Sequence, residues 1–258
     1  MKRSLIGIGV LLVLILAWGG PREGLAAPRG TLTIGIPTDI NTLDPTMSPE
    51  VNSLNVAFSV MEPLLYLDAQ DRIKPLLAES WEVVDNVTYV FRLRKGVKFH
   101  NGEPLTGKAV EFSWKRSQEK HRVNRVAFAS VTRIDHLDDH TIRLVTAKPD
   151  PIFLKKMAQV TAAIFPPKYA AEQGDEAASL RPVGTGPFVF GEWIKGDHAT
   201  FKANPAYYLP DVPKVQTLLW RFIPESAARV AALQTGQVDL AIRIPPHQAA
   251  PLERDANL

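Results

Sequence analysis

Stretches in which apolar and polar residues alternate recur along this chain, and each of them is short. Alternation over about four to eight residues is typical of a strand with one buried face, and polar turns between such stretches indicate hairpins. Turns of this kind fall at residues 68–71, 85–86 and 138–140. The pattern predicts strands at residues 31–36, 64–67, 81–84, 88–93, 131–137, 141–146, 188–194, 199–203, 215–223 and 238–242.

A longer period marks the helices. Between residues 51 and 61, apolar side chains recur at positions 51, 54, 57, 58 and 61, a spacing that favours a helix with an apolar face. Thr106 precedes another helical pattern as a candidate N-cap, and Gly236 follows the one at residues 225–235 as a candidate C-terminal glycine. Shorter helices are predicted at residues 151–158 and 167–173.

These elements predict a mixed α+β fold and not a simple alternation of strands and helices. Hairpins dominate most of the chain, whereas the last elements run strand, helix, strand over residues 215–242. Such a unit favours two parallel strands joined by the helix. No internal repeat or low-complexity linker divides the sequence.

The first 26 residues have the composition of a secretory signal peptide. Lys2 and Arg3 form a basic start, residues 5–18 are apolar apart from glycines, and the small residues Gly24 and Ala26 suit cleavage after Ala26. An uncleaved membrane anchor is the alternative, but the apolar stretch is shorter than the roughly 20 residues that span a bilayer. We therefore expect export, with the signal peptide cleaved near Ala26.

Composition narrows the classes of protein further. The chain has no cysteine, so an exported form depends on its hydrophobic core and not on disulfides. Removing residues 1–26 takes away three basic residues and one acidic residue, which lowers the formal net charge from +3 to +1. A nearly neutral chain without a basic run argues against nucleic acid as a partner.

One segment carries most of the information on function. Residues 77–116 read LAESWEVVDNVTYVFRLRKGVKFHNGEPLTGKAVEFSWKR, which predicts two strands, a basic turn, a tight turn and a capped helix. This order of pieces resembles the signature of the family 5 extracellular solute-binding proteins, the peptide, nickel and opine receptors of ABC importers. The matching elements are Leu77-Ala78-x-Ser80-Trp81, Tyr89-x-Phe91-x-Leu93-Arg94, Gly96-Val97-Lys98-Phe99, Asn101-Gly102-x-Pro104-Leu105-Thr106 and Phe112-Ser113-Trp114.

Further matches to the same family are spread along the chain. They are Leu43-Asp44-Pro45, Phe58 with Glu62-Pro63-Leu64, Pro75-x-Leu77-Ala78, Asp139-His140-Thr141, Val183-Gly184-Thr185-Gly186-Pro187-Phe188, Asn204-Pro205-x-Tyr207-Tyr208 and Leu233-Gln234-x-Gly236-x-Val238-Asp239. Members resemble two-lobed proteins of roughly twice this length. The resemblance therefore implies a periplasmic-binding-protein-like type II lobe with an inserted strand-rich subdomain, and with the second lobe missing.

The resemblance also implies a division of the chain. Residues 27–60 and 180–245 would form the first part of the core lobe, and residues 61–179 the inserted subdomain. Residues 246–258 would begin the crossover to the absent second lobe. On this interpretation the chain is the N-terminal part of a receptor, from a truncated gene, a split gene or a fragment.

The helix after Thr106 departs from the family pattern. Members place an acid three residues past the cap, where this chain has Ala109. Thr106 is still expected to cap the helix, without the reciprocal bond of a capping box. The expected cost is about 0.5–1 kcal/mol, with no change of fold.

Two stretches are candidate contacts with a solute. Family members place the residues after Leu-Asp-Pro at their cleft, which implies contacts from Met47, Ser48, Pro49 and Glu50; an ordinary surface loop is the alternative. Gly184 and Thr185 lie in a turn that either presents backbone amides to a solute or returns the chain to the first domain, and we favour the turn.

Histidines and acids suggest a metal site only at first sight. His136 and His140 share a predicted hairpin with three acids, Asp135, Asp138 and Asp139. The two imidazoles there are not held on one helical face, so a solvated turn is favoured over a metal site. His100 is expected to serve the turn in which it lies. We predict no metal and no cofactor.

Other residues have structural interpretations as well. The tryptophans at positions 81, 114, 193 and 220 fit core patterns, and none is assigned to a solute. Arg92, Arg94 and Lys95 are expected to form a solvated strand end, with docking on a membrane permease as the alternative. The sequence contains no nucleophile elbow, HExxH zinc motif or phosphate loop, so we do not expect an enzyme.

The resemblance implies the substrate-binding component of an ABC importer. It would capture a small peptide or similar solute in the periplasm and deliver it to the permease in the inner membrane, as a monomer. No cysteine stands at the predicted cleavage site to carry a lipid anchor, which favours a soluble periplasmic protein. The alternative is a truncated, non-transporting lobe that acts as an interaction or holdase-like module.

Overall fold

The computed structural model describes residues 28–119, 122 and 125–252. The predicted signal peptide lies outside these residues, as does the end of the predicted crossover at 253–258. Helices and strands occur together throughout the described part, which confirms the mixed α+β class. In that part of the chain, no helix combines the length and the apolar character needed to cross a membrane.

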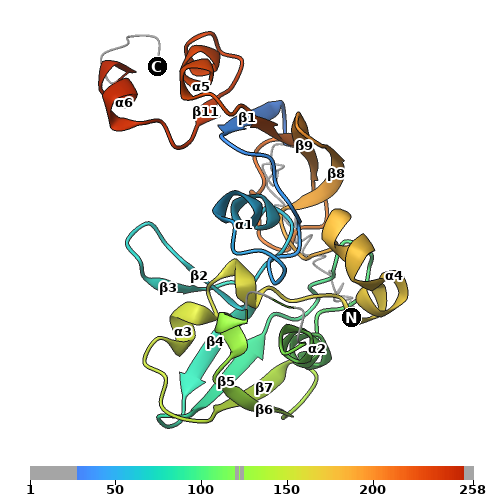
Figure 1. Ribbon diagram of the computed structural model, residues 1–258. Coiled ribbons are helices and arrows are strands. Elements are labelled where there is room, and N and C mark those ends of the chain that lie inside the picture. Colours follow the sequence, from blue (N-terminus) through green and yellow to red (C-terminus); the bar gives the residue numbers. More distant parts are fainter. Residues whose placement is uncertain (1–27, 120–121, 123–124, 253–258) are drawn as a thin grey trace, which may run out of the picture.

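A five-stranded sheet forms one end of the molecule (Figure 1). Strand β1 (Thr31–Ile36) pairs in parallel with β10 (Thr217–Phe222) on one side and with β11 (Leu240–Ala241) on the other. The sheet continues from β10 through two antiparallel strands, β9 (His198–Ala203) and β8 (Phe188–Ile194). The order across the sheet is therefore β11-β1-β10-β9-β8.

Helix α5 (Ser226–Gln234) carries the chain from β10 to β11, which lie on either side of β1. The predicted strand–helix–strand unit is thus confirmed as a parallel crossover. Gly236 has a φ of +71°, in the left-handed region that glycine adopts without steric cost, as expected for the residue that ends this helix. Helix α6 (Pro246–Leu252) follows β11.

A four-stranded antiparallel sheet forms the opposite end of the molecule. It contains β4 (Ala78–Val83), β5 (Thr88–Leu93), β7 (Thr141–Thr146) and β6 (Val131–His136), in that order across the sheet. Helix α2 (Gly107–Ser117) packs on it through Ala109 and Val110, which belong to the same buried cluster as Phe91 and Leu144. The predicted hairpins 81–93 and 131–146 are confirmed as neighbouring pairs within this sheet.

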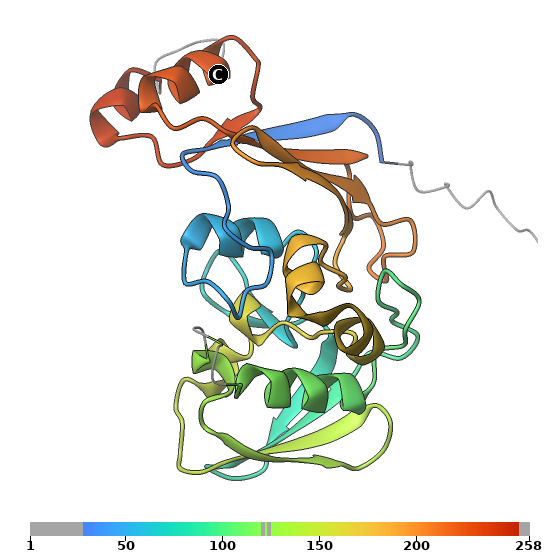
Figure 2. The same ribbon diagram turned by 45° about the vertical axis from the view of Figure 1, so that its right-hand side comes forward.

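Helices α1 (Val51–Ala57) and α4 (Pro167–Leu180) lie between the two sheets (Figure 2). A separate hairpin, β2 (Leu65–Leu67) and β3 (Ile73–Pro75), projects beside them. The remaining short elements are η1 (Val126–Phe128), α3 (Phe153–Lys156) and η2 (Val160–Ala162).

Two hydrophobic clusters hold these layers together. One lies under the four-stranded sheet and gathers residues from 64 to 164, including Phe91 and Phe153. The other lies against the five-stranded sheet and includes Ile36, Phe201 and Trp220. Full burial of one such apolar side chain contributes about 1.5–3 kcal/mol to folding, so the packing of both clusters dominates stability. The domain boundaries inferred from the resemblance stay a prediction.

The start of α2 corrects one expectation. Thr106 occupies the N-cap position in an extended conformation, but its side chain makes no capping hydrogen bond. The N–H of Ala109, which a capping hydroxyl would bind, donates instead to the backbone carbonyl of Thr106 at 3.0 Å. The N–H of Gly107 donates to the carbonyl of Asp139 at 2.9 Å, so the β6–β7 turn satisfies the first N–H of the helix.

Two helices differ in length from their sequence patterns. Helix α1 ends at Ala57, because the chain turns at residues 58–60 through bonds such as Ser59 N–H to the Val56 carbonyl at 3.0 Å. Helix α4 continues well past residue 173 as two helical pieces joined at Gly174. Gly174 has a φ of +74° and a ψ of 174°, a backbone conformation that interrupts the helix and that glycine permits.

Candidate functional site

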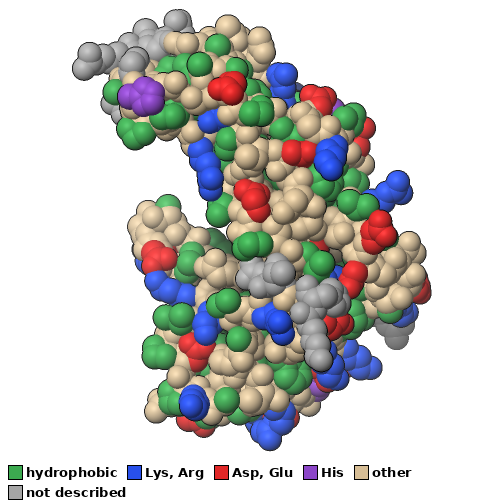
Figure 3. Space-filling view, in the orientation of Figure 1, with side chains coloured by type: hydrophobic (Ala, Val, Ile, Leu, Met, Phe, Trp, Pro, Cys, Tyr) green, Lys and Arg blue, Asp and Glu red, His purple; other side chains and the backbone are tan. Residues whose placement is uncertain are grey.

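A groove runs along helix α1 between the β2–β3 hairpin and the five-stranded sheet. It consists of two adjoining hollows that share Phe58, Ala158 and Gln159 as lining residues. We call them the hairpin pocket, beneath β2–β3, and the helix pocket, along α1. Figure 3 shows the surface hollowed between the hairpin and the part of the molecule formed by α5 and α6.

The helix pocket has a volume of about 550 Å³. Helix α1 contributes Val51, Leu54 and Asn55, and strand β10 contributes Trp220. The indole N–H of Trp220 donates to the Ser59 hydroxyl at 3.3 Å, so its ring is held in a fixed orientation. Trp220 is a core residue, as predicted, but it also lines the groove, which the sequence did not indicate.

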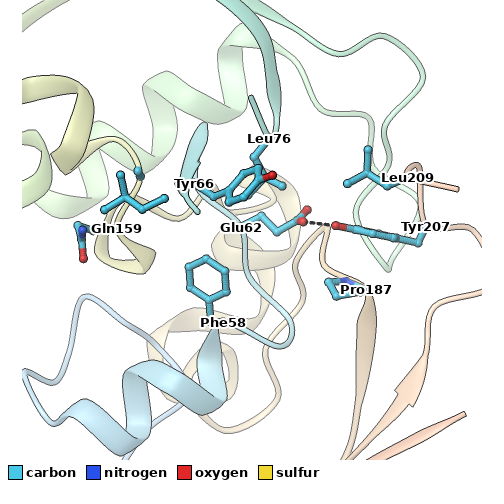
Figure 4. Close-up of a pocket in the computed structure, with 10 residues that line it drawn as sticks. Phe58, Glu62, Tyr66, Leu76, Gln159, Pro187, Tyr207 and Leu209 are labelled. Carbon is cyan, nitrogen blue, oxygen red and sulfur yellow. Dashed lines mark hydrogen bonds between the residues drawn. The ribbon is translucent and has the colours of Figure 1, made fainter. Parts of the chain in front are cut away.

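The hairpin pocket has a volume of about 440 Å³ and a mainly apolar wall (Figure 4). Its aromatic residues come from three separate segments of the chain: Phe58 after α1, Tyr66 in β2 and Tyr207 after β9. Phe58 is 40% exposed and Tyr66 is 37% exposed, which is high for large apolar side chains. Leu67, Leu76, Ala158, Pro187 and Leu209 complete the apolar lining.

A buried carboxylate closes one side of the hairpin pocket. Glu62 Oε1 accepts hydrogen bonds from the hydroxyls of Tyr207 at 2.6 Å and Tyr208 at 3.2 Å. Its Oε2 accepts from the Thr185 hydroxyl at 2.8 Å and also from Tyr208 at 3.2 Å. Figure 4 shows the bond between Glu62 and Tyr207 at the edge of the pocket. These contacts join the segment after α1 to the segments before β8 and after β9.

Burial dominates the electrostatics of this network. It raises the pKa of Glu62, while the three hydroxyl donors and the nearby Arg94 act in the opposite direction. Burial and the adjacent Glu62 charge raise the pKa values of Tyr207 and Tyr208 well above the ordinary tyrosine range. Both tyrosines therefore remain hydrogen-bond donors at neutral pH.

The hairpin that covers the pocket is braced at both ends. Lys155 of α3 forms an ion pair with Asp71 in the turn between β2 and β3. At the base of the hairpin, the Leu65 N–H donates to the Met157 carbonyl at 3.1 Å. The position of Tyr66 over the pocket is thus set by contacts with the segment that also supplies Gln159.

The predicted solute contacts Met47, Ser48, Pro49 and Glu50 form the loop that leads directly into α1 and the helix pocket. The buried Ser48 hydroxyl accepts a hydrogen bond from the Glu50 N–H at 3.0 Å. The Glu50 carboxylate accepts from the Ser53 N–H at 2.6 Å and so caps α1. Met47 is half-buried and Pro49 is exposed. Solute contact from this loop stays a prediction.

Asp44 anchors the start of this loop. Its Oδ1 accepts from the Thr46 N–H at 2.9 Å, and its Oδ2 accepts from Arg116 at 2.6 Å and Arg122 at 2.9 Å. Both arginines also pair with Asp175 of α4, and the Arg116 guanidinium lies 4.2 Å from the centre of the Phe165 ring. We name this group the arginine clasp.

The other predicted contacts, Gly184 and Thr185, lie in a turn packed against the segment after α1. The Gly186 N–H donates to the Val60 carbonyl at 2.9 Å, and a Cβ on Gly184 would clash with the same oxygen. Thr185 is buried with its hydroxyl on Glu62. The described contacts of both residues are thus with the protein itself, and contact with a solute stays a prediction.

His100 holds the same turn from the other side. The backbone N–H of His100 donates to the Gly184 carbonyl at 2.8 Å, and the ring Nδ1 accepts from the Gly184 N–H at 3.4 Å. Its Nε2 lies 2.9 Å from the Gly186 carbonyl and therefore carries the proton as a donor. Burial lowers the pKa of His100, which favours this neutral form. His100 thus joins its own turn to the 184–186 turn.

The remaining candidate residues lie apart from the groove. His136 Nε2 lies 2.8 Å from Glu111 Oε2 of α2. Across the described residues, no three His, Cys, Asp or Glu side chains converge to hold a metal ion. Trp81 and Trp114 pack against the first hydrophobic cluster and Trp193 against the second.

Comparison with known proteins shows which family this chain belongs to. The family model described as bacterial extracellular solute-binding proteins, family 5 Middle, matches residues 72–258. The glutathione-binding protein GsiB of Escherichia coli O157:H7 is 30% identical over 260 residues, which cover 100% of this chain and 49% of that protein. The chain spans about half the length of the curated relatives it matches.

Solved structures give the same result. The PBP AgaA of A. tumefaciens R10, in complex with agropinic acid, has a TM-score of 0.83 and 29% identity; the match covers 88% of this chain and 46% of that one. The periplasmic binding protein DppA of Helicobacter pylori, in complex with the peptide STSA, has a TM-score of 0.80 and 26% identity, covering 88% and 49%. The periplasmic-binding-protein-like fold is thereby confirmed. The comparisons give no support to a non-transporting interaction module.

Proposed function

The chain belongs to the family 5 bacterial extracellular solute-binding proteins, and we propose that it captures a small peptide or similar solute for an ABC importer in the groove along α1. The observation that carries the proposal is the groove itself. It combines half-exposed aromatic side chains with a few polar groups, the composition that is typical of sites for small molecules.

The groove is suited to binding and not to bond chemistry. The residues that line its two pockets are mainly apolar, and the carboxylate of Glu62 is engaged by three hydroxyls. Affinity would come from excluding water, from shape and from a few hydrogen bonds. In a receptor of the relatives' length, a second half would close over the groove and complete the enclosure of the solute.

The loop at Met47, Ser48, Pro49 and Glu50 would supply backbone contacts at one end of the groove. It leads into Val51 of the helix pocket and is held by the arginine clasp and by the cap on α1. A loop ordered before the solute arrives loses little conformational entropy on binding. Thr185 would act on the pocket through its hydrogen bond to Glu62, and Gly184 through the close packing of its turn against Val60.

The cellular setting follows from the same proposal. The protein would be exported to the periplasm, act as a monomer and deliver its solute to the importer's permease in the inner membrane. Cleavage of the signal peptide near Ala26 and the identity of the permease belong to the proposal as well.

Ligand-observed NMR tests the proposal directly. Saturation-transfer difference spectra of residues 27–258 with a mixed pool of dipeptides to pentapeptides should show transfer to peptide protons. A Trp220→Ala variant, which removes one wall of the helix pocket, should weaken that transfer, whereas Trp81→Ala at the four-stranded sheet should not. Absence of transfer from a folded sample would overturn the proposal.

A further inference from the structure

The hairpin pocket has a feature that bears on which solutes fit. Among the described residues that line it, Glu62 is the only acid, and there is no lysine or arginine. An acid in an aromatic pocket would ordinarily suggest a cationic ligand, held by charge and by cation–π contact. Whether Glu62 is available to a ligand therefore decides the chemistry of the pocket.

Glu62 is already engaged on both oxygens. Three hydroxyls donate to its carboxylate: Tyr207 to Oε1, Thr185 to Oε2, and Tyr208, whose single proton is shared between the two oxygens at 3.2 Å each. The side chain is also 2% exposed. An incoming ammonium or guanidinium would have to displace a buried hydroxyl to reach it, and the displaced group would lose its partner.

Arg94 lies close to this network but does not line the pocket. Its guanidinium lies 5.7 Å from the centre of the Tyr208 ring and donates to the Leu76 carbonyl at 2.6 Å. Its charge opposes the rise in the pKa of Glu62 that burial causes. An anionic group would meet no cationic side chain among the described residues that line the pocket.

The rest of the wall suits an apolar group. Phe58 and Tyr66 present half-exposed rings, and Leu76 and Leu209 complete the surface around them. Phe58 also lines the helix pocket, so one ring borders both hollows. A volume of about 440 Å³ accommodates a side chain as large as that of phenylalanine.

We infer that the hairpin pocket selects an uncharged apolar or aromatic side chain of the solute, while the solute's backbone lies in the helix pocket. Gln159 lines both pockets and is exposed, so its amide lies where a peptide group would pass between them. This inference rests on the proposed function and adds the class of side chain that the solute carries.

A series of tripeptides Ala-X-Ala tests the inference, with X as Leu, Phe, Lys or Glu. Competition in saturation-transfer difference spectra of residues 27–258 gives their relative affinities. Leu and Phe should bind at least about tenfold more tightly than Lys and Glu, and saturation should be strongest on the protons of the apolar side chain. Equal binding of all four peptides, or a preference for Lys, would overturn the inference and leave the proposed function intact. No binding by any peptide would overturn both.

Two variants locate the preference in the pocket. Phe58→Ala and Tyr66→Ala both truncate exposed rings, so both should keep the melting temperature while reducing the preference for Leu and Phe at least about threefold. Leu137→Ala is the matched control, because Leu137 is 48% exposed in the turn between β6 and β7, outside both pockets. If the pocket variants keep the full preference, the selecting site lies elsewhere and the inference is wrong.

Discussion

Asp44 and Arg122 form an ion pair in which neither side chain is accessible to solvent, with 2.9 Å between Asp44 Oδ2 and Arg122 Nη1. Asp44 lies in the loop after β1, and Arg122 lies after α2, so the pair joins the loop of one sheet to the helix of the other. A buried carboxylate left without its partner is costly because the interior cannot solvate its charge.

The first prediction follows from that pair. Arg122→Ala should lower the free energy of unfolding by about 3–5 kcal/mol, because Asp44 would remain buried with one of its two arginine partners gone. Urea denaturation measures the change. Arg72→Ala, which breaks an exposed ion pair with Asp68, should cost no more than about 1 kcal/mol. If both variants lose the same unfolding free energy, burial of the arginine clasp does not determine how much it contributes to stability.

The second prediction concerns Gly184. Gly184→Ala should destabilise the protein by more than about 2 kcal/mol, because the new methyl group would meet the backbone carbonyl of Val60, which cannot move aside as a side chain can. Gly35→Ala is the control: its methyl group would lie 3.5 Å from the Val238 side chain, an ordinary contact. Circular dichroism during thermal unfolding gives the melting temperatures of both variants. A Gly184→Ala variant as stable as Gly35→Ala would refute the packing argument.

The third prediction is a pH dependence that arises from His100. Burial lowers the pKa of His100 in the folded protein, so the unfolded chain binds the proton first as the pH falls below about 6.5. The contribution of His100 to stability is complete above that pH and declines as the pH falls toward the folded-state pKa. The difference in unfolding free energy between the wild type and His100→Gln should therefore shrink from pH 7.5 to pH 5. If the difference in unfolding free energy stays constant or grows between pH 7.5 and pH 5, His100 does not have a lowered pKa in the folded protein.

The fourth prediction concerns affinity. The groove is open on one side in the described part of the chain (Figure 3), so a bound peptide would keep part of its surface in water. We expect residues 27–258 to bind peptides with dissociation constants weaker than about 100 μM. Isothermal titration calorimetry gives the value. A dissociation constant below about 1 μM would mean that these residues already form a complete site.

Local patterns in the sequence were sufficient for most of the secondary structure. Thr31–Ile36 and Thr88–Leu93 are strands with the predicted bounds, because alternation along one strand reports directly on which face is buried. The predicted Thr106 side-chain cap was wrong, because the N–H of Ala109 donates to the backbone carbonyl of Thr106. The partner of the Gly107 N–H could not be read from the local sequence either, since the Asp139 carbonyl lies in a turn 32 residues further along the chain.

The groove could be predicted only in part. The loop at residues 47–50 leads into Val51, which lines the helix pocket, and solute contact from the loop itself stays a prediction. The aromatic wall of the groove is contributed by Phe58, Tyr66 and Tyr207, and its junction by Gln159, all brought together by tertiary packing and not by spacing along the chain. Phe58 and Tyr207 belong to short motifs of the resemblance, but nothing in those motifs indicated that both face one hollow.

The carboxylate of Glu62 has one further consequence, which concerns movement. Its hydroxyl partners come from the two chain segments that flank strands β8 and β9, so this carboxylate joins both of them to the segment after α1. Moving the segment after α1 away from the β8–β9 hairpin would break these buried hydrogen bonds. We therefore expect the part of the pocket wall that carries Glu62 and Tyr207 to keep its spacing when a solute enters.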